Sequence, residues 1–280
     1  MTTAKAFAPA KINLALHVTG QRTDGYHLLD SLVVFADIGD SLTVRVADEP
    51  ALTVDGPMAA GVPRDGRNLV MRAADLMGVT ASIHLEKHLP NAAGLGGGSS
   101  DAAAALRALH DLTGQPLPDI TALTGLGADV PVCVQPNTAR MRGVGEEVTP
   151  VPGLPALHAV LINPGLPVMT QLVFANLSKR DNPPMPDALP DFASEAQFIA
   201  WLSEMRNDLQ GPAMAAHPLI AHVFDKLKVT PGCLLARMSG SGATCFGLYG
   251  DAETAASAAG RLRQANAGWW VVATRLNAVN

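Results

Sequence analysis

A glycine-rich segment at residues 94–98 most constrains how this chain can fold. It reads Gly94-Leu95-Gly96-Gly97-Gly98 and runs directly into Ser99-Ser100-Asp101 and a run of alanines. Glycine loses backbone entropy on folding and supplies no side chain to a core, so such a cluster suits a backbone that wraps closely around a ligand. The residues that follow predict a helix from about Ser99 to His110. A glycine loop that leads into a helix gathers free N–H groups at the positive end of the helix dipole, which is typical of a phosphate site.

Two common phosphate-binding signatures do not fit this segment. A P-loop requires a Gly-Lys pair, which the chain lacks. The dinucleotide fingerprint requires a third glycine where Ser99 stands, and residues 86–90 separate the loop from the preceding apolar strand pattern. A nicotinamide-dependent oxidoreductase is therefore disfavoured. A flexible linker is the remaining alternative, but linkers are polar on both sides and do not run into a strong helix former.

Composition places the chain among compact globular proteins. Of its 280 residues, 48% are hydrophobic and 16% are charged, which supplies enough core for one large domain or two closely joined ones. The net charge of −5 argues against non-specific nucleic-acid binding. The sequence shows no basic leader, no membrane-spanning apolar run and no clustered metal ligands, and its three cysteines are widely spaced. We therefore expect a cytoplasmic protein with reduced thiols and no membrane partner.

The pattern of apolar residues predicts a mixture of strands and helices. Strands are expected near residues 11–18, 28–36, 42–46, 81–85, 157–162, 233–238, 244–249 and 269–273, and helices near residues 68–77, 99–110, 117–127, 193–205, 216–228 and 251–264. A change to proline-rich sequence predicts a domain boundary near residue 155, with domains at residues 1–155 and 156–280. The strand, strand, helix and strand expected after residue 232 resemble half of a ferredoxin-like layer.

Three polar residues outside the loop are candidates for chemistry. Lys11 and Asn13 alternate with apolar residues, so both project from the same face of the first expected strand. An isolated lysine in such a pattern is usually solvated, whereas a polar neighbour on the same face also fits a strand that lines a cleft. Asp129 lies just past an expected helix end and before Pro131. A turn or C-capping role is the ordinary interpretation of an aspartate at such a place.

Three separated motifs give the chain a resemblance to the GHMP kinases, named for galactose, homoserine, mevalonate and phosphomevalonate kinases. They are Pro-Ala-Lys-Ile-Asn at residues 9–13, the glycine loop at residues 94–100 and Ser-Gly-Ser-Gly-Ala at residues 239–243. These motifs occur in the family's order and span the chain. Residues 20–27 (Gly-Gln-Arg-Thr-Asp-Gly-Tyr-His) and residues 127–131 (Gly-Ala-Asp-Val-Pro) are similar to the family members that phosphorylate an alcohol joined to cytidine diphosphate.

The resemblance implies a two-domain α+β fold. The N-terminal domain would contain a mixed sheet and an ATP site of left-handed βαβ type, and the C-terminal domain would contain a ferredoxin-like α/β layer. The resemblance further implies a small-molecule kinase that uses ATP and Mg²⁺, takes a cytidyl diphosphate substrate and exists as a monomer or weak homodimer. Another kinase of the family, acting on mevalonate, homoserine or a sugar, remains an alternative. A non-catalytic nucleotide-binding regulator on the same fold is a second alternative.

The resemblance also assigns roles to individual residues. Asp129 would be the general base that faces the substrate hydroxyl, and Lys11 would lie beside it and lower the pKa of that hydroxyl. Asn68 and Lys87 would contact the adenosine, and Mg²⁺ would reach the protein through Ser99 or Ser100. The residues that would hold the ATP phosphates are Pro90, Asn91, Ala92, Ala93, Gly94, Leu95, Gly96, Gly97, Gly98, Ser99 and Ser100.

The acceptor substrate would be bound by a second set of residues. Asn13 would orient it, and Tyr26, His27 and Phe174 would grip the cytidine end by stacking and hydrogen bonds. Alternatives are an aromatic residue that shields the hairpin and, for Phe174, an ordinary core position. Gly240, Ser241 and Gly242 would approach the diphosphate or support the nucleotide loop, unless they form a plain β-turn. Val33 and the Val168-Met169 pair depart from the pattern of some relatives near the cytosine pocket.

Overall fold

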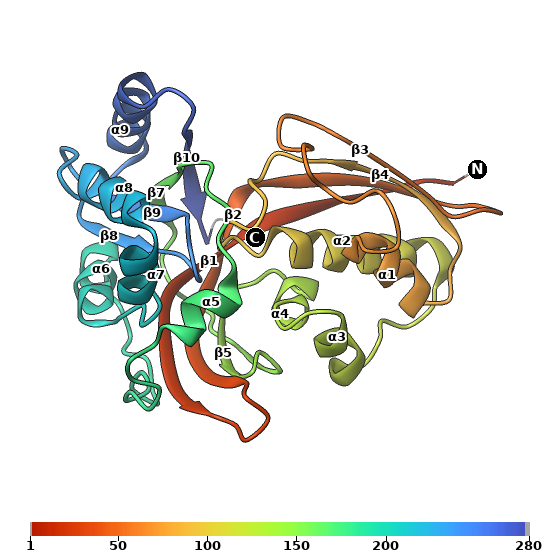
Figure 1. Ribbon diagram of the computed structural model, residues 1–280, viewed down its shortest axis with the longest axis horizontal. Helices are drawn as coiled ribbons and strands as arrows, with labels where there is room; N and C mark the ends of the chain where they lie inside the picture. The colour runs from red at the N-terminus through yellow and green to blue at the C-terminus, as the bar shows by residue number, and fades with distance from the viewer. Residues whose placement is uncertain (1, 278–280) are drawn as a thin grey trace. The chain divides into compact units, whose positions relative to one another are not determined.

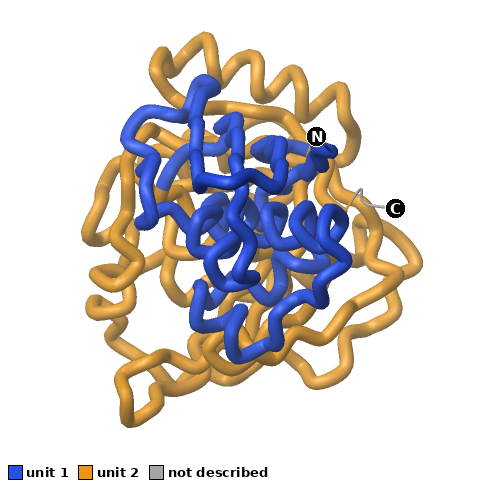
Figure 2. The backbone as a smooth tube through the Cα atoms, turned by 90° about the vertical axis from the view of Figure 1, so that its right-hand side faces the viewer, with its two compact units in different colours: residues 1–11, 38–91, 96–136 blue, residues 12–37, 92–95, 137–280 orange. Residues whose placement is uncertain are grey.

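The computed structural model describes residues 2–277 of the chain. Its contacts divide the chain into two compact units that are interleaved along the sequence (Figure 2). Unit 1 comprises residues 1–11, 38–91 and 96–136, and unit 2 comprises residues 12–37, 92–95 and 137–280. Two long strands, β1 (Ala4–Gln21) and β2 (His27–Val46), pair with each other and contribute residues to both units. The domain boundary near residue 155 stays a prediction.

Unit 1 combines strands with a group of helices. Strand β4 (Ala81–Glu86) pairs antiparallel with β2 and parallel with β3 (Ala51–Asp55), so the sheet is mixed. The helices are α1 (Leu69–Leu76), α2 (Gly97–Thr113), α3 (Ile120–Leu126) and α4 (Val130–Val134), and both α1 and α4 pack against α2 (Figure 1). The alanines of α2, together with Leu106 and Leu109, are fully buried. Their small side chains let the neighbouring helices approach the backbone of α2 closely.

Unit 2 is built on an antiparallel sheet. In it β2 is followed by β10 (Trp270–Leu276), β7 (Leu157–Asn163), β9 (Cys245–Tyr249) and β8 (Leu235–Met238). Strand β5 (Ala139–Gly143) pairs antiparallel with both β2 and β6 (Glu147–Pro150). The helices are α5 (Thr170–Ala175), α6 (Glu195–Glu204), α7 (Gln210–Ala216), α8 (Pro218–Lys228) and α9 (Ala252–Ala265).

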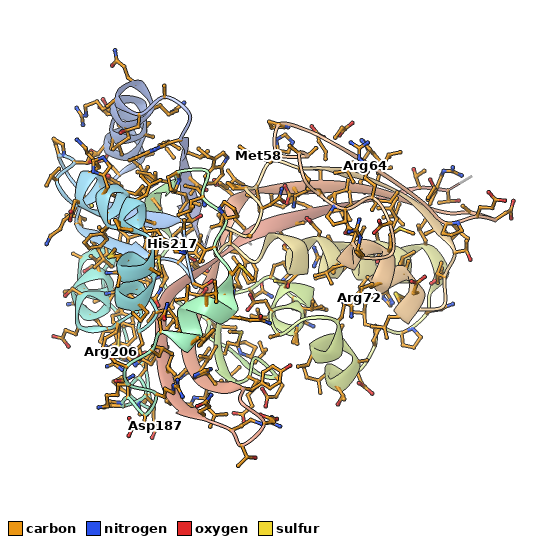
Figure 3. All side chains as sticks on the ribbon, in the orientation of Figure 1. Met58, Arg64, Arg72, Asp187, Arg206 and His217 are labelled. Carbon is orange, nitrogen blue, oxygen red and sulfur yellow. The ribbon has the colours of Figure 1, made fainter. Side chains whose placement is uncertain are left out.

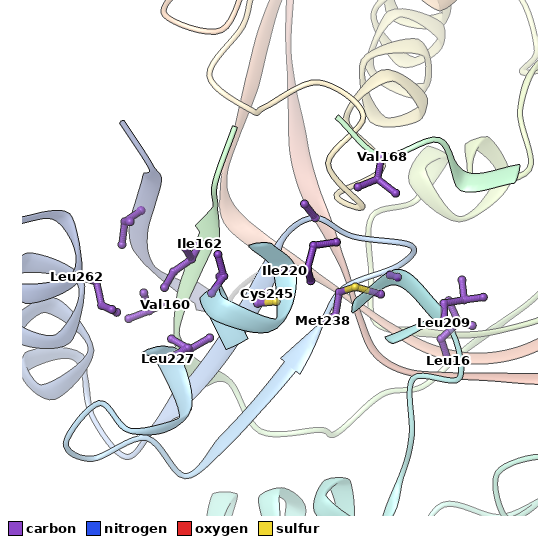
Figure 4. Packing of buried hydrophobic residues seen from close by; sticks show 14 of the residues in the cluster. Leu16, Val160, Ile162, Val168, Leu209, Ile220, Leu227, Met238, Cys245 and Leu262 are labelled. Atoms are coloured by element: carbon purple, nitrogen blue, oxygen red, sulfur yellow. The ribbon is translucent and has the colours of Figure 1, made fainter. Parts of the chain in front are cut away.

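One hydrophobic core holds these elements of unit 2 together. Helix α9 packs on β7 and β10, and α8 packs on β8 and β9. Figure 4 shows the packing at close range, where Ile220 and Leu227 of α8 meet Val160 and Ile162 of β7 and Leu262 of α9. These side chains recur at the three- and four-residue spacing of a helix and at the alternate positions of a strand, which is why the sequence pattern predicted both kinds of element.

Every strand and helix predicted from the sequence is present, with three differences. The strands expected at residues 28–36 and 42–46 form the single strand β2, in which a Cβ atom on Gly39 would lie 2.2 Å from the carbonyl oxygen of Ala8. The helix α2 runs from Gly97 to Thr113, longer than the predicted Ser99–His110, with Gly96 as its N-cap and no side-chain cap. The third difference is a set of short elements that were not predicted: β3, β5, β6, α4, α5 and α7.

In the described part of the chain, none of the helices has the length and apolar character that crossing a membrane would require.

Candidate functional site

An ion pair between Lys11 and Asp129 is the chemical centre of unit 1. Lys11 lies on β1 and Asp129 immediately precedes α4, and their Nζ and Oδ1 atoms are 2.6 Å apart. The Lys11 side chain is 4% exposed and that of Asp129 is 33% exposed, so the carboxylate is open to solvent on a side away from a buried ammonium. Asp129 lies in a turn and is the N-cap residue of α4, but its side chain makes no capping hydrogen bond and contacts Lys11 instead, and the C-cap of the preceding helix α3 is Gly127.

The start of α2 lies next to this ion pair. Gly96 has φ of +61°, and a Cβ atom there would lie 3.1 Å from Cβ of Lys11. A Cβ atom on Gly127 would lie 3.5 Å from the hydroxyl of Ser99, so the first turn of α2 also approaches the segment that carries Asp129. The first N–H groups of a helix have no partner within the helix. Unit 1 therefore brings a lysine, a carboxylate, a serine hydroxyl and unpaired N–H groups together.

The two serines of the first turn differ in their surroundings. Ser100 is fully buried, and its hydroxyl donates a 2.8 Å hydrogen bond to the carbonyl oxygen of Pro9. Ser99 is partly exposed. Across residues 2–277, no group of three or more His, Cys, Asp and Glu side chains is arranged to hold a metal ion. Of the two predicted metal contacts, Ser99 has the hydroxyl that a ligand can reach.

The front of the glycine loop is held by backbone contacts within unit 2. The carbonyl oxygens of Ala92 and Ala93 accept hydrogen bonds from the N–H groups of Val168 and Thr244, and that of Gly94 accepts from Ser239 Oγ at 2.8 Å. A side chain on Gly94 would come within 2.3 Å of the Ser239 carbonyl oxygen. Only glycine therefore fits where the loop meets the segment at residues 239–242.

The residues that precede these contacts are anchored in unit 1. Asn91 donates from Nδ2 to the carbonyl oxygens of Met58 and Ala60, both at 3.2 Å (Figure 3 labels Met58). Pro90 follows a residue, Leu89, whose N–H group is bonded to the carboxylate of Asp40. Residues 89–94 are thus held on the N-terminal side of the loop, while residues 96–98 stay partly or fully exposed.

The segment at residues 239–242 forms a turn beside Asn13. The N–H group of Gly242 donates to the carbonyl oxygen of Ser239, as in a β-turn. The backbone N–H of Asn13 donates to Ser239 Oγ at 3.1 Å, and its Nδ2 donates to Ser31 Oγ at 2.8 Å. Its Oδ1 atom is buried and has no hydrogen-bond partner among the described residues. Ser241 exchanges a 2.8 Å hydrogen bond with Thr170, which begins α5.

Two predicted aromatic contacts meet face to face in unit 2. The rings of His27 and Phe174 stack with centroids 4.7 Å apart and an angle of 23° between their planes. Burial, and secondarily the charge of Arg180, lower the pKa of His27, which favours the neutral form of the ring. Phe174 also packs against the core of unit 2, as the ordinary interpretation of this residue expects. Tyr26 is 63% exposed at the tip of the hairpin between β1 and β2.

The two predicted adenosine contacts are engaged in other interactions. Asn68 is the N-cap of α1, where its Oδ1 accepts from the N–H of Val70 and its Nδ2 donates to the carbonyl oxygen of Pro63. Lys87 is 3% exposed, and its ammonium contacts the carboxylates of both Asp40 and Asp101. The contact of either side chain with adenosine stays a prediction. Sequence reasoning missed Asp40 altogether, because it lies between the strands predicted at residues 28–36 and 42–46 and no local pattern marks its partners.

Comparisons with known proteins show the family of the chain. The family models for the GHMP kinases N terminal domain and for GHMP kinases C terminal match residues 68–138 and 188–268. A 4-diphosphocytidyl-2-C-methyl-D-erythritol kinase from Dinoroseobacter shibae is 57% identical over 271 residues, which cover 96% of this chain and 94% of that protein. The protein of the same name from Cereibacter sphaeroides is 55% identical over 274 residues, which cover 97% of this chain and 99% of that protein.

Solved structures show the same relationship. The crystal structure of a 4-(cytidine 5'-diphospho)-2C-methyl-D-erythritol kinase superposes with a TM-score of 0.76 at 36% identity and covers 98% of this chain and 99% of that chain. A homoserine kinase from Cytophaga hutchinsonii superposes with a TM-score of 0.67 at 18% identity, covering 98% of this chain and 95% of that chain. The second likeness concerns the fold alone.

Proposed function

The chain belongs to the GHMP kinase family, and we propose that it phosphorylates the 2-hydroxyl of 4-diphosphocytidyl-2-C-methyl-D-erythritol. The products would be the 2-phosphate and ADP, in the non-mevalonate route to isoprenoid precursors. The sequence motifs predicted this family and a two-domain α+β fold with a mixed sheet, and both predictions are confirmed. The family also makes the protein a small-molecule kinase with ATP as the phosphoryl donor. The observation that carries the proposal is the Lys11–Asp129 pair beside the start of α2.

Asp129 would act as the general base. Lys11 engages one oxygen of its carboxylate at 2.6 Å, and the other oxygen can accept the proton of the substrate hydroxyl. The ammonium of Lys11 fixes the orientation of the carboxylate and would lie close to the hydroxyl oxygen as negative charge develops there. The carboxylate is exposed enough to meet a substrate, and the buried lysine is rigid enough to hold it in place.

The first turn of α2 would receive the nucleotide phosphates. Its unpaired N–H groups and the helix dipole favour an anion, but the dipole contributes only about 0.3–1 kcal/mol at an exposed site. Mg²⁺ bound with the nucleotide would neutralise more of the phosphate charge. Among the described residues, the partly exposed hydroxyl of Ser99 could contact this Mg²⁺, and no cluster of carboxylates is arranged to bind it. Phosphates and water would therefore be the main ligands of the metal. Residues 90–98 would shape the phosphate site, and Asn68 would lie near the adenosine.

The acceptor substrate would be recognised by residues of unit 2. Tyr26, His27 and Phe174 would bind its cytosine, because aromatic faces stack on a base and a neutral imidazole can hydrogen-bond to it. The unpaired Oδ1 of Asn13 would accept a hydrogen bond from the substrate, while Gly240, Ser241 and Gly242 would lie along its diphosphate. We further place the reaction in the cytoplasm and expect a monomer or a weak homodimer.

The experiment that tests this function is an assay of ADP release with a panel of acceptors. The purified chain is given Mg-ATP and, separately, 4-diphosphocytidyl-2-C-methyl-D-erythritol, mevalonate, homoserine or galactose. We expect turnover with the cytidyl substrate alone. Turnover with another alcohol instead would keep the chemistry of Lys11 and Asp129 and overturn the roles of Tyr26, His27 and Phe174. ATP binding without turnover of any acceptor would overturn the enzymatic proposal in favour of a regulator.

A further inference from the structure

Asn207 is a buried asparagine whose two amide donors are both in use. It lies in unit 2, between α6 and α7, and is 8% exposed. Its Nδ2 donates to the carbonyl oxygens of Met238 and Gly240, at 2.7 and 2.9 Å, and its Oδ1 accepts from the N–H of Leu209 at 2.9 Å. A carboxylate has no N–H to donate, so an aspartate at this position could make neither bond to a carbonyl oxygen. The contacts therefore require an amide.

The backbone around Asn207 is fixed to β1. Leu16 of β1 lies opposite Asn207 in a parallel bridge. Its N–H donates to the carbonyl oxygen of Arg206 at 2.8 Å, and its carbonyl oxygen accepts from the N–H of Asp208 at 2.9 Å. Leu16 and Leu209, on either side of this contact, both belong to the hydrophobic core of unit 2, and Figure 4 labels them. The amide of Asn207 is therefore presented from a rigid base.

The bond to Gly240 sets the orientation of one peptide in the turn at residues 239–242. In a trans peptide the C=O group and the N–H group of the next residue point in opposite directions. Because the carbonyl of Gly240 points to Asn207, the N–H of Ser241 on the same peptide points away from it. This N–H has no hydrogen-bond partner among residues 2–277, although Ser241 is only 7% exposed. A donor held in this way is unfavourable alone and is available to a ligand.

An acceptor without a partner lies beside the same turn. The Oδ1 of Asn13 is buried and unpaired among the described residues, and a Cβ atom on Gly240 would lie 3.5 Å from it. The hydroxyl of Ser239, at the start of the turn, accepts from the backbone N–H of Asn13 at 3.1 Å. Unit 2 thus places a free donor and a free acceptor at one turn. A phosphate oxygen can accept from the donor, and a substrate hydroxyl can donate to the acceptor.

We propose that Asn207 is a positioning residue for the acceptor substrate. By holding the carbonyl of Gly240, it keeps the N–H of Ser241 directed at the substrate's diphosphate, where the N–H donates to a phosphate oxygen. A hydrogen bond to an ionised phosphate is of the strong, charge-assisted kind. The inference rests on the proposed function for the identity of the acceptor, and it gives a role to a side chain that does not itself touch the acceptor.

The test compares the binding of cytidine diphosphate (CDP) with that of cytidine, which lacks the diphosphate. Calorimetry on the full chain measures both dissociation constants, with the nucleotide site filled by Mg²⁺ and a non-hydrolysable ATP analogue. We expect the wild type to bind CDP at least about tenfold more tightly than cytidine. Asn207→Leu keeps the shape of the side chain and removes its donors without adding charge. In this variant the preference for CDP should fall below about threefold, while the constant for cytidine stays within about twofold of the wild type.

The matched control is Asn182→Leu. The Nδ2 of Asn182 also donates to two carbonyl oxygens, those of Val18 and Lys179 at 3.2 and 3.4 Å, but it makes no contact with the turn. This variant should keep the wild-type preference for CDP over cytidine. A general loosening of unit 2 would weaken the binding of both ligands alike, whereas a loss of positioning weakens the binding of CDP alone. Circular dichroism checks that each variant is folded.

Nuclear magnetic resonance provides a second readout, on the wild-type chain. The amide proton of Ser241 should move downfield when CDP is added and stay nearly unchanged with cytidine, because only CDP supplies the charged acceptor. Asn207→Ala, which removes the amide with a smaller change in packing than a lost fold would cause, should show a smaller shift with CDP. If neither variant of Asn207 folds, the response of the Ser241 amide in the wild type decides the question alone.

The outcomes separate this inference from the proposed function. Wild-type binding of CDP that is no tighter than that of cytidine overturns the inference, and so does a folded Asn207→Leu variant with the wild-type preference. A Ser241 amide that responds equally to both ligands also overturns it. None of these measurements requires turnover. The expected preference for CDP combined with no ADP release from the cytidyl substrate therefore overturns the proposed function and leaves the role of Asn207 standing.

Discussion

Asp129 is the side chain whose replacement we expect to cost the most turnover. Asp129→Asn keeps the size of the group and its contact with Lys11 but removes the base that accepts the hydroxyl proton. We expect kcat to fall by roughly 10²–10⁴-fold, the usual contribution of a positioned acid–base group. The KM values should change far less, because the amide occupies the same space. Steady-state assay of ADP release measures both constants.

The matched control for this change is Asp111→Asn. Asp111 is exposed and lies near the C-terminal end of α2, so this variant should keep the wild-type kcat. An Asp129→Asn variant with wild-type turnover would exclude Asp129 as the base. A large rise in KM with unchanged kcat would assign the residue to binding instead.

The buried carboxyl of Asp101 also predicts how stability depends on pH. Its pKa is raised to about 8 in the folded chain, against about 3.9 in an unfolded one, so the folded state binds the extra proton between these values. The contribution of this group is therefore fully present below about pH 4 and is lost as pH rises to about 8. Asp101→Asn lacks this dependence. We expect its free energy of unfolding to improve relative to the wild type as pH increases over that window.

Urea unfolding at several pH values between about 5 and 8 measures this difference, with Asp111→Asn as the reference. A constant difference between Asp101→Asn and the wild type across this range would show that Asp101 is already ionised in the folded protein.

Sequence reasoning located the residues that belong to motifs but not the partners that hold them. Lys11 and Asp129 could be named together because each lies in a segment typical of the family. The contacts of Asp40 with Lys87 and Leu89 join residues 47 and 49 positions apart, and no local sequence pattern indicates them. A buried carboxylate signals that it needs a partner, but its identity depends on tertiary structure.

Among the structural elements, the start of α2 makes the most specific demand on the sequence. Gly96 has φ of +61°, and a side chain there would press on Lys11, with 3.1 Å between the two Cβ atoms. We expect Gly96→Ala to lower the free energy of unfolding by about 1–2 kcal/mol, from backbone strain alone. It should also raise the KM for ATP, because the lysine and the loop both shift. Thermal unfolding and steady-state kinetics measure the two effects.

Gly98→Ala is the comparison for this variant. Gly98 lies inside the first turn of α2, and its nearest contact for an added Cβ atom is Cδ1 of Leu69 at 3.6 Å, an ordinary packing distance. Because alanine is the better helix former, this variant should gain stability by about 0.5–1 kcal/mol. Equal loss of stability in both variants would mean that crowding at the helix start, and not the positive φ of Gly96, sets the requirement for glycine.

Long elements were predictable from the sequence and short ones were not, for a physical reason. The helices α2 and α9 carry enough helical periodicity to be recognised without their surroundings. Strand β3 has five residues and exists through its parallel pairing with β4, and α5 has six residues after a proline-containing stretch. Elements of this length are marginal alone and gain their stability from tertiary packing, which a local pattern does not contain.

At the scale of the whole chain, the interleaving of the two units was beyond sequence reasoning. The proline-rich stretch after Pro152 marks a change in composition and led to a predicted boundary there. Membership in a unit, however, is decided by contacts, and β1 and β2 each leave one unit and continue in the other. Periodicity identifies a strand, but it gives no sign of the residue at which the strand's neighbours change.

The same two strands predict that the units unfold together. Each of these strands is one continuous segment with residues in both units. We therefore expect that unfolding of β1 and β2 in one unit disrupts the sheet of the other. Cys133 of unit 1 and Cys245 of unit 2 report on this separately, because both are fully buried and burial raises the pKa of each thiol to about 12. Both thiols should resist alkylation in the native protein and become reactive at the same urea concentration.

Mass spectrometry of peptides after pulsed alkylation gives the labelling midpoint of each cysteine. Cys233, which is only partly buried, provides an internal reference for local exposure, and it should react before the other two. Two distinct midpoints for Cys133 and Cys245 would show that one unit survives without the other. Coincident midpoints would mean that a destabilising change in either unit, such as Gly96→Ala, lowers the stability reported by both thiols.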